Sequence, residues 1–139
     1  MFLCVMAKNG EMVSEQERML HATRMLALTA SPLVPVHLGP FFGLAAPAMV
    51  PLRPLTAKRD GLVAIGNVRL DNRRSVRLLG RKTEPNASDL DLVLAAYEER
   101  GRSCIRDMLG DFAFAVYDSR TGELVAARDT FGEIGRAHV

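Results

Sequence analysis

The clearest pattern of hydrophobic and polar positions lies in the last third of the chain. Large apolar residues alternate with alanines along Asp111–Asp118, a second apolar run fills Glu123–Asp129, and the polar segment between them ends in Gly122. Two apolar runs joined by a short glycine-containing segment are typical of a β-hairpin. We therefore predict that these two runs are antiparallel strands.

A helical pattern precedes this hairpin. Ser88 is a favourable N-cap, the apolar residues after it recur at helical spacing, and Gly101 is a favourable residue just beyond a helix end. A helix is therefore predicted over Ser88–Arg100, with a shorter one from Ser103 to Leu109. The predicted buried stripe of the longer helix consists of Leu90, Val93, Leu94 and Tyr97.

The first 80 residues carry weaker patterns. Ser14 and Glu17 form a capping box, which predicts a helix over Ser14–Thr29. Asp71-Asn72 can start a short helix that ends at Gly80. Short apolar runs predict strands at Phe2–Met6, Val34–Leu38, Phe41–Ala46 and Gly61–Leu70. Strands, a helical middle and a closing hairpin together predict an α+β fold with layered sheets.

A run of basic residues accompanies the predicted helix that ends at Gly80. Its members are Arg69, Arg73, Arg74, Arg77, Arg81 and Lys82. Such a run is usually a solvated helix face, and a site for an anion or a protein partner is the alternative. The pattern leaves both interpretations open.

Composition and charge exclude several classes of protein. The chain has 139 residues, of which 48% are hydrophobic and 24% charged, as in an ordinary globular domain. Its net charge of +2 is too small to indicate binding to nucleic acid or an anionic membrane. Glycines and prolines interrupt the longest apolar run, Leu38–Leu52, so we predict no membrane helix.

The cysteines and histidines bear on the predicted cellular compartment and on metal binding. Cys4 and Cys104 are the two cysteines, and no basic region precedes the first apolar run as in a signal peptide. Two distant thiols without a secretory signal indicate a reduced, cytoplasmic protein. The three histidines are scattered, which predicts no metal site.

The last seven residues, Glu133–Val139, read EIGRAHV. One back-translation of this tail contains the start of a common sequencing adapter. We interpret residues 133–139 as an artefact to be excluded from fold reasoning, so that the natural domain would cover residues 1–132 and be truncated. A genuine C-terminus with this spelling is the alternative.

The segment from Ser88 to Gly132 carries a distinctive set of motifs. They are Ser88, Asp89, Tyr97, Gly101, Leu109–Phe114, Tyr117-Asp118 and Ala127–Gly132. In this order they resemble the amino-terminal, class II glutamine amidotransferase domain of the asparagine synthetase family. Leu62–Arg73 resembles the strand, turn and helix that carry Phe-Asn-Gly-Glu-Ile-Tyr-Asn in most members, although its Arg-Leu-Asp-Asn-Arg is more similar to β-lactam synthetases and lasso-peptide cyclases.

This resemblance implies a fold, an activity and a missing partner. The family domain is a four-layer αββα sandwich of the Ntn-hydrolase type, and in active members it hydrolyses glutamine. The ammonia passes to a following synthetase domain that uses ATP and magnesium to activate a carboxylate and form an amide. The resemblance therefore implies that this segment itself holds no cofactor, that glutamine is its expected ligand, and that its partner is its own C-terminal synthetase domain, absent here.

The family's catalytic residues are only partly matched. Active members use a cysteine exposed as the first residue, whose α-amine serves as the base. Here position 2 is Phe2, and the nearest thiol is Cys4, whose backbone nitrogen is an amide. Cys4 is therefore either a core residue of the first apolar run or a displaced nucleophile.

The substrate-binding positions depart from the pattern as well. Active members form the oxyanion hole with an Asn side chain and the next Gly N–H, whereas this chain has Gly66 and then Asn67. A one-residue shift turns a strand side chain to the opposite face, so Asn67 is expected to point away from the pocket. The stretch His37–Ala46 lacks the family's carboxylate-binding Arg. Asp89 matches the residue that binds the substrate amine, and it equally matches an acidic residue favoured at a helix N-terminus.

These observations lead to three hypotheses. The first is a degenerate glutaminase-like domain that no longer hydrolyses glutamine and supports an ATP-dependent amide-forming domain. The second is a working glutaminase domain of an asparagine synthetase, whose true N-terminus begins elsewhere or at Cys4. The third is a stand-alone binding module with no enzyme attached.

Overall fold

The computed structural model describes residues 3–6, 33–38, 42–47, 56–80 and 83–130, and only the backbone in the first three of these ranges. The chain divides into two units, Met1–Leu52 and Arg53–Val139, each treated separately below. The predicted helix Ser14–Thr29 and the tail 133–139 lie outside the described residues.

The first unit contains a three-stranded antiparallel sheet. Its strands are β1 (Leu3–Met6), β2 (Leu33–Leu38) and β3 (Phe42–Pro47), in the order β1-β3-β2. All three strands lie where the apolar runs predicted them. The register of β2 with β3 shifts between Pro35 and His37. Proline has no N–H to donate to a ladder, and an edge strand such as β2 tolerates this.

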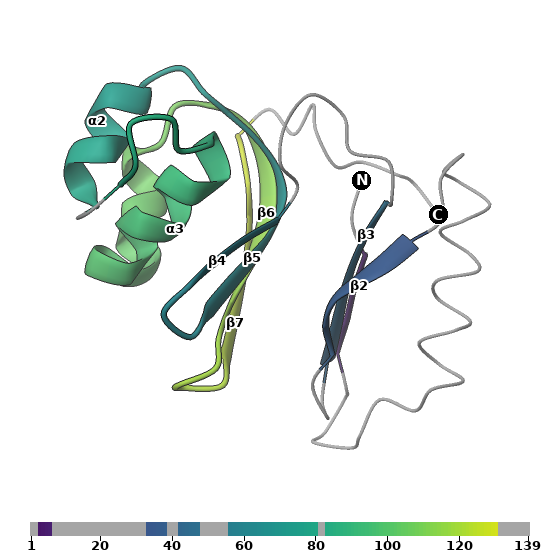
Figure 1. Ribbon diagram of the computed structural model, residues 1–139. Helices are drawn as coiled ribbons and strands as arrows, with labels where there is room; N and C mark the ends of the chain where they lie inside the picture. Colours follow the sequence, from purple (N-terminus) through teal and green to yellow (C-terminus); the bar gives the residue numbers. More distant parts are fainter. Residues whose placement is uncertain (1–2, 7–32, 39–41, 48–55, 81–82, 131–139) are drawn as a thin grey trace. The chain divides into compact units, whose positions relative to one another are not determined.

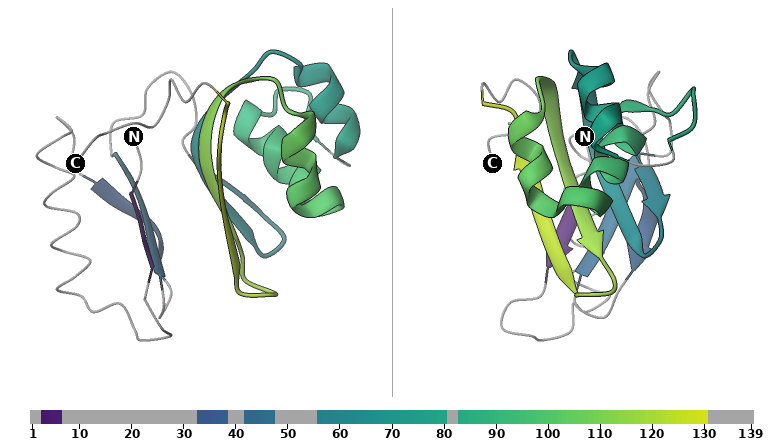
Figure 2. Two further views of the ribbon diagram at one scale, coloured as in Figure 1. Left: turned by 180° about the vertical axis from the view of Figure 1, so that it is seen from behind. Right: turned by 90° about the vertical axis from the view of Figure 1, so that its left-hand side faces the viewer.

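The second unit has a four-stranded antiparallel sheet with its helices on one face, as Figures 1 and 2 show. Its elements, in chain order, are β4 (Thr56–Arg59), β5 (Leu62–Leu70), α2 (Arg73–Leu79), α3 (Asp89–Arg100), the 3-10 helix η1 (Gly101–Asp107), β6 (Gly110–Asp118) and β7 (Glu123–Arg128). The strand order is β4-β5-β6-β7. The architecture confirms the predicted α+β class.

The predicted hairpin and the predicted helix before it are both confirmed. β6 and β7 pair antiparallel from Asp118↔Glu123 to Ala113↔Arg128. Helix α3 begins with a reciprocal cap: the N–H of Asp91 donates to Ser88 Oγ at 3.1 Å, and the N–H of Ser88 donates to Asp91 Oδ2 at 3.0 Å. Gly101 ends the helix with φ of +56°, a conformation that glycine adopts without steric strain.

The core of the second unit lies between the sheet and its helices. The four predicted stripe residues of α3 are all buried, and so are Leu92, Ala95 and Ala96, which the stripe did not include. Gly80, the C-cap of α2, contributes to this burial, because a Cβ built on it would lie 2.7 Å from the Cβ of Ala95. The close approach of the two helices therefore buries a second side of α3.

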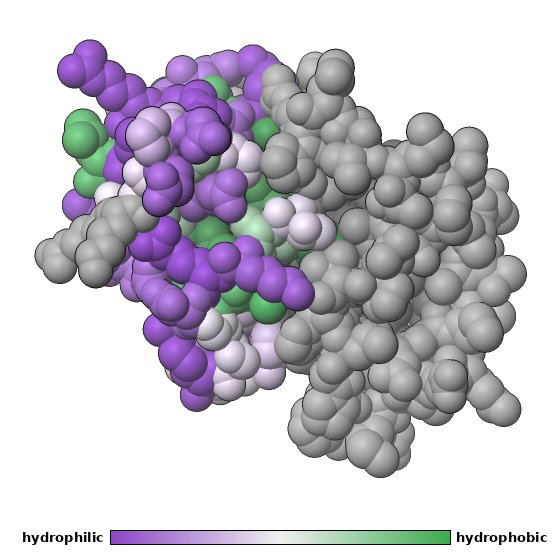
Figure 3. Space-filling view, viewed as in Figure 1, coloured by the Kyte–Doolittle hydropathy of each residue, from purple (hydrophilic) through white to green (hydrophobic). Residues whose placement is uncertain are grey.

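One face of β5 packs against the helices. Leu62, Ala64, Val68 and Leu70 point toward the helices and belong to the core. On the outside, the described residues over the helices are mostly hydrophilic, as the space-filling view in Figure 3 shows. Within the described part of the chain, no helix is long and apolar enough to cross a membrane.

Candidate functional site

Cys4, the candidate nucleophile, lies within a paired strand. It belongs to β1 and pairs with Leu44 of β3, while Leu3 before it pairs with Ala45. Its backbone nitrogen is thus an amide inside a strand, without the proton-accepting lone pair of an α-amine. The structure describes only the backbone here, so a role for the thiol stays a prediction.

Gly66 of β5 lies close to the backbone of β6. It pairs with Phe114, and a Cβ built on Gly66 would lie 2.4 Å from Phe114 Cβ and 2.4 Å from the Ala113 carbonyl oxygen. Real side-chain carbons do not approach that closely, so packing alone requires glycine at this position. This requirement holds whether or not the Gly66 N–H has a role in catalysis.

Asn67 lies on the opposite face of β5 from Gly66. Its register partner is Ala113, and it alternates with the core-facing Gly66 and Val68. The side chain is half-buried. Asn67 therefore points to the face of the sheet that carries no helix, and its role in an oxyanion hole stays a prediction.

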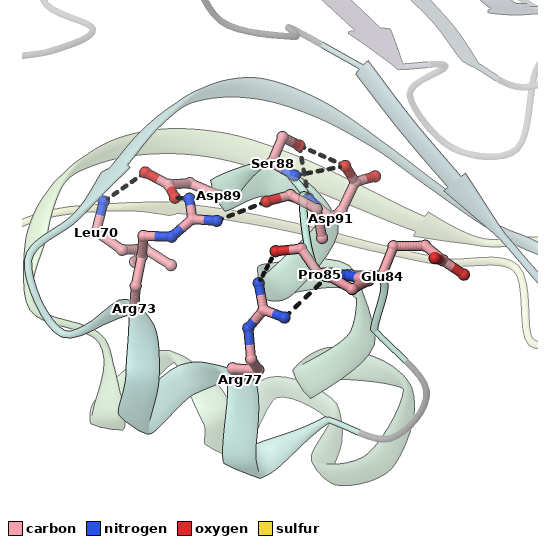
Figure 4. Close-up of polar contacts among 9 residues, drawn as sticks. Leu70, Arg73, Arg77, Glu84, Pro85, Ser88, Asp89 and Asp91 are labelled. Carbon is pink, nitrogen blue, oxygen red and sulfur yellow. Dashed lines mark hydrogen bonds and ion pairs between the residues drawn. The ribbon is translucent and has the colours of Figure 1, made fainter.

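Asp89 is the first residue of α3, and its carboxylate joins three elements (Figure 4). Oδ2 accepts a hydrogen bond from the Leu70 N–H at the end of β5, at 3.0 Å, and Oδ1 accepts one from Arg73 Nη1 in α2. The Asp89 side chain is 12% exposed. Both carboxylate oxygens thus already have donors from within the protein.

Two arginines of α2, Arg73 and Arg77, bind the segment before α3. Arg73 Nη2 donates to the Ala87 carbonyl at 2.6 Å. Arg77 donates to the carbonyls of Glu84 and Pro85 at 3.1 and 2.9 Å, as Figure 4 also shows. These two members of the basic run therefore stabilise a loop. Arg81 and Lys82 lie outside the described residues.

The Arg-Leu-Asp-Asn-Arg segment, residues 69–73, makes further hydrogen bonds that the sequence did not predict. Arg69 Nε donates to Asp111 Oδ2 at 2.9 Å, and the resulting ion pair raises the pKa of the Arg69 guanidinium. Asn72 Nδ2 donates to the Asp107 carbonyl at 2.7 Å, and Asn72 Oδ1 accepts from the Leu109 N–H at 2.9 Å. The segment thus joins β5 and α2 to the start of β6. A side-chain amide at a helix N-cap, able to donate and accept at once, is the signal that could have indicated such ties.

Cys104 has the properties of a core thiol. It is fully buried in η1, and burial raises its pKa to about 11. At neutral pH the thiol is therefore protonated and a poor nucleophile. Among the described residues, no group of three His, Cys, Asp or Glu side chains could hold a metal ion.

Comparison with known proteins points to one family. The family described as "Glutamine amidotransferase domain" matches residues 51–135. Asparagine synthetase [glutamine-hydrolyzing] 3 of Bacillus subtilis is 37% identical over 81 residues, which are 55% of this chain and 13% of that enzyme. A probable asparagine synthetase [glutamine-hydrolyzing] of Dictyostelium discoideum is 29% identical over 86 residues, 59% of this chain and 15% of that enzyme.

A shorter match involves a differently named protein. Amidase chry2 of Gibberella zeae is 42% identical over 45 residues, which are 32% of this chain and 7% of that protein. In all three relatives the aligned part is 15% or less of the relative's length. The chain thus spans a small part of the proteins it resembles.

Proposed function

The chain belongs to the glutamine amidotransferase domain family, and from that premise we propose that it is the glutaminase-like domain of an asparagine-synthetase-like, amide-forming enzyme and does not hydrolyse glutamine itself. Its similarity to enzymes named as glutamine-hydrolysing asparagine synthetases supports the choice of parent. In the proposed enzyme, a separate synthetase domain would use ATP and magnesium in the cytoplasm.

The position of the Cys4 thiol is the main observation that supports the proposed loss of glutamine hydrolysis. Amide hydrolysis by this family's route needs a nucleophile and an adjacent base. Cys4 follows Leu3 within β1, so its nitrogen is a peptide amide in the ladder with β3.

Two features of substrate binding support the same proposal. No arginine occurs in β2 or β3 to hold the glutamine carboxylate. The Asp89 carboxylate, the candidate group for the glutamine amine, is bonded to Leu70 N–H and to Arg73. Neither the carboxylate nor the ammonium group of glutamine would therefore find an unoccupied partner among these residues.

The proposal includes a four-layer αββα sandwich. The face of the second unit's sheet without helices carries Ile65, Ala113 and Ala115 at its centre, all small or apolar. Such a surface is suited to packing against a second sheet. In this arrangement the domain would serve as a shaped support for the synthetase domain.

The test is glutamate release from glutamine by the full-length parent enzyme. We expect no release above a blank without protein, either from the wild type or from Cys4→Ala. Cys104→Ala is the matched control, because it removes a thiol that is already inert. Release that is lost in Cys4→Ala and kept in Cys104→Ala would make Cys4 the nucleophile and overturn the proposal. Intact-mass analysis would then show whether processing exposes Cys4 as the first residue.

A further inference from the structure

The contact between Arg73 and Asp89 bears on which ligands the domain admits. Arg73 is held at two points, since Nη1 donates to Asp89 Oδ1 and Nη2 donates to the Ala87 carbonyl at 2.6 Å. The side chain of Arg73 is 44% exposed and that of Asp89 is 12% exposed. The guanidinium therefore bonds a mostly buried carboxylate while it is also fixed to the loop before α3.

A guanidinium and an α-ammonium group compete for the same partner. Both are cations that donate N–H bonds to a carboxylate, and the planar guanidinium does so in a fixed geometry. Once Arg73 neutralises Asp89, a second cation gains little attraction to the carboxylate and is repelled by the arginine. The Leu70 N–H occupies the other oxygen at 3.0 Å.

We propose that Arg73 is a specificity-determining residue that excludes the α-ammonium group of glutamine, and of α-amino acids generally, from Asp89. This inference rests on the proposed function, because it assigns the lost substrate binding to a named side chain. Arg73 stands in for the ligand's cation and keeps the carboxylate satisfied without a ligand. The Arg-Leu-Asp-Asn-Arg segment thus both connects neighbouring elements and blocks an amino-acid-binding site.

Arg77 provides a matched control on the same helix. It lies one turn after Arg73 and donates to two backbone carbonyls, those of Glu84 and Pro85, at 3.1 and 2.9 Å. Replacing Arg77 removes the same charge and the same kind of loop contact. It leaves the contact between Arg73 and Asp89 in place.

The experiment is a glutamine titration of the 139-residue chain followed by amide chemical shifts. We expect no saturable binding by the wild type or by Arg77→Gln. Arg73→Gln should gain affinity by at least about tenfold, because the competing cation is gone. Adding Asp89→Asn to Arg73→Gln should abolish the gain. Equal binding by the wild type and Arg73→Gln, or no gain in a folded Arg73→Gln, would overturn the assignment.

A measurement on the wild type covers the case in which Arg73→Gln does not fold. The anchored guanidinium should show separate, slowly exchanging Nη signals, whereas one averaged signal would contradict the assignment. The two proposals fail differently. Glutamate release by the wild type would contradict both the proposed function and the role of Arg73. No release together with no gain in Arg73→Gln would contradict only the role of Arg73.

Discussion

The two ends of the β5–β6 pair each hold an aspartate bonded to an arginine, and the two pairs join very different parts of the chain. At the Leu62–Asp118 end, Asp118 accepts bonds from the Arg120 N–H and from Arg120 Nε, both at 2.9 Å and two residues away. At the Leu70–Gly110 end, Asp89 bonds Leu70, 19 residues away, and Arg73, 16 residues away.

The Asp118–Arg120 pair stabilises a local turn, whereas the Asp89–Arg73 pair connects different elements. Asp118 shapes the β6–β7 turn, which the next strand pair supports through the Ser119 N–H donating to the Gly61 carbonyl at 2.9 Å. Asp89 instead links the end of β5 and the start of α2 to the start of α3. Asp89 thus bonds residues 19 and 16 positions away in other elements, whereas Asp118 bonds an arginine of its own turn.

The largest difference between the ends should appear at their glycines. Gly110 has φ of +138°, and a Cβ there would lie 2.0 Å from the Arg69 carbonyl oxygen, whereas Gly122 has φ of +72° and no atom within 4 Å. Gly110→Ala combines strain with a backbone clash and should lower the free energy of unfolding by about 3 kcal/mol or more. Gly122→Ala has only the left-handed strain and should cost about 1 kcal/mol.

Urea unfolding followed by tyrosine fluorescence measures both variants. The chain has two tyrosines and no tryptophan. Tyr97 and Tyr117 both belong to the second unit, so the signal reports on the unit that contains the substitutions. Equal losses for Gly110→Ala and Gly122→Ala would contradict the different constraints on the two ends.

The smallest expected effect is the pH dependence at the Asp118 end. Hydrogen bonds from the Arg120 side chain hold the pKa of Asp118 below its ordinary value. A lowered folded-state pKa contributes stability above the unfolded value of about 3.9 and loses it as the pH falls through the folded value. Because Arg120 is 52% exposed, the contribution should stay below about 1 kcal/mol.

The corresponding measurement compares wild type with Asp118→Asn at several pH values. The difference in their free energies of unfolding should be constant near neutral pH and should shrink as the pH falls below about 4, where the wild-type carboxyl becomes protonated. A difference that grows on acidification would reverse the expected sign. It would show that Asp118 is more stable in its protonated form.

Much of the second unit could be predicted from the sequence because its signals are local. The cap at Ser88, the stop at Gly101 and the turn ending at Gly122 each depend on neighbours within a few residues. Strand β4 was missed, since Thr56–Arg59 has four residues and two of them are charged. Asp60-Gly61, both with positive φ, is the hairpin signal that could have indicated it.

The candidate site was less predictable because its contacts are distant in sequence. The local pattern around Asp89 fits both an amine-binding residue and an ordinary helix N-terminus. Only the folded chain shows that Leu70 and Arg73 supply donors to both carboxylate oxygens. For Gly66, the close approach of Phe114 depends on strand register, which no motif in β5 alone specifies.

A double-mutant cycle on each aspartate–arginine pair tests the central claim most directly. The variants are Asp89→Asn with Arg73→Gln, and Asp118→Asn with Arg120→Gln, each measured singly and together by urea unfolding with tyrosine fluorescence. We predict a coupling free energy of about 1.5 kcal/mol or more for Asp89 with Arg73, and of less than about 0.5 kcal/mol for Asp118 with Arg120. Equal coupling free energies, or a larger one for Asp118 with Arg120, would contradict the claim that Arg73 and Asp89 stabilise each other within the protein.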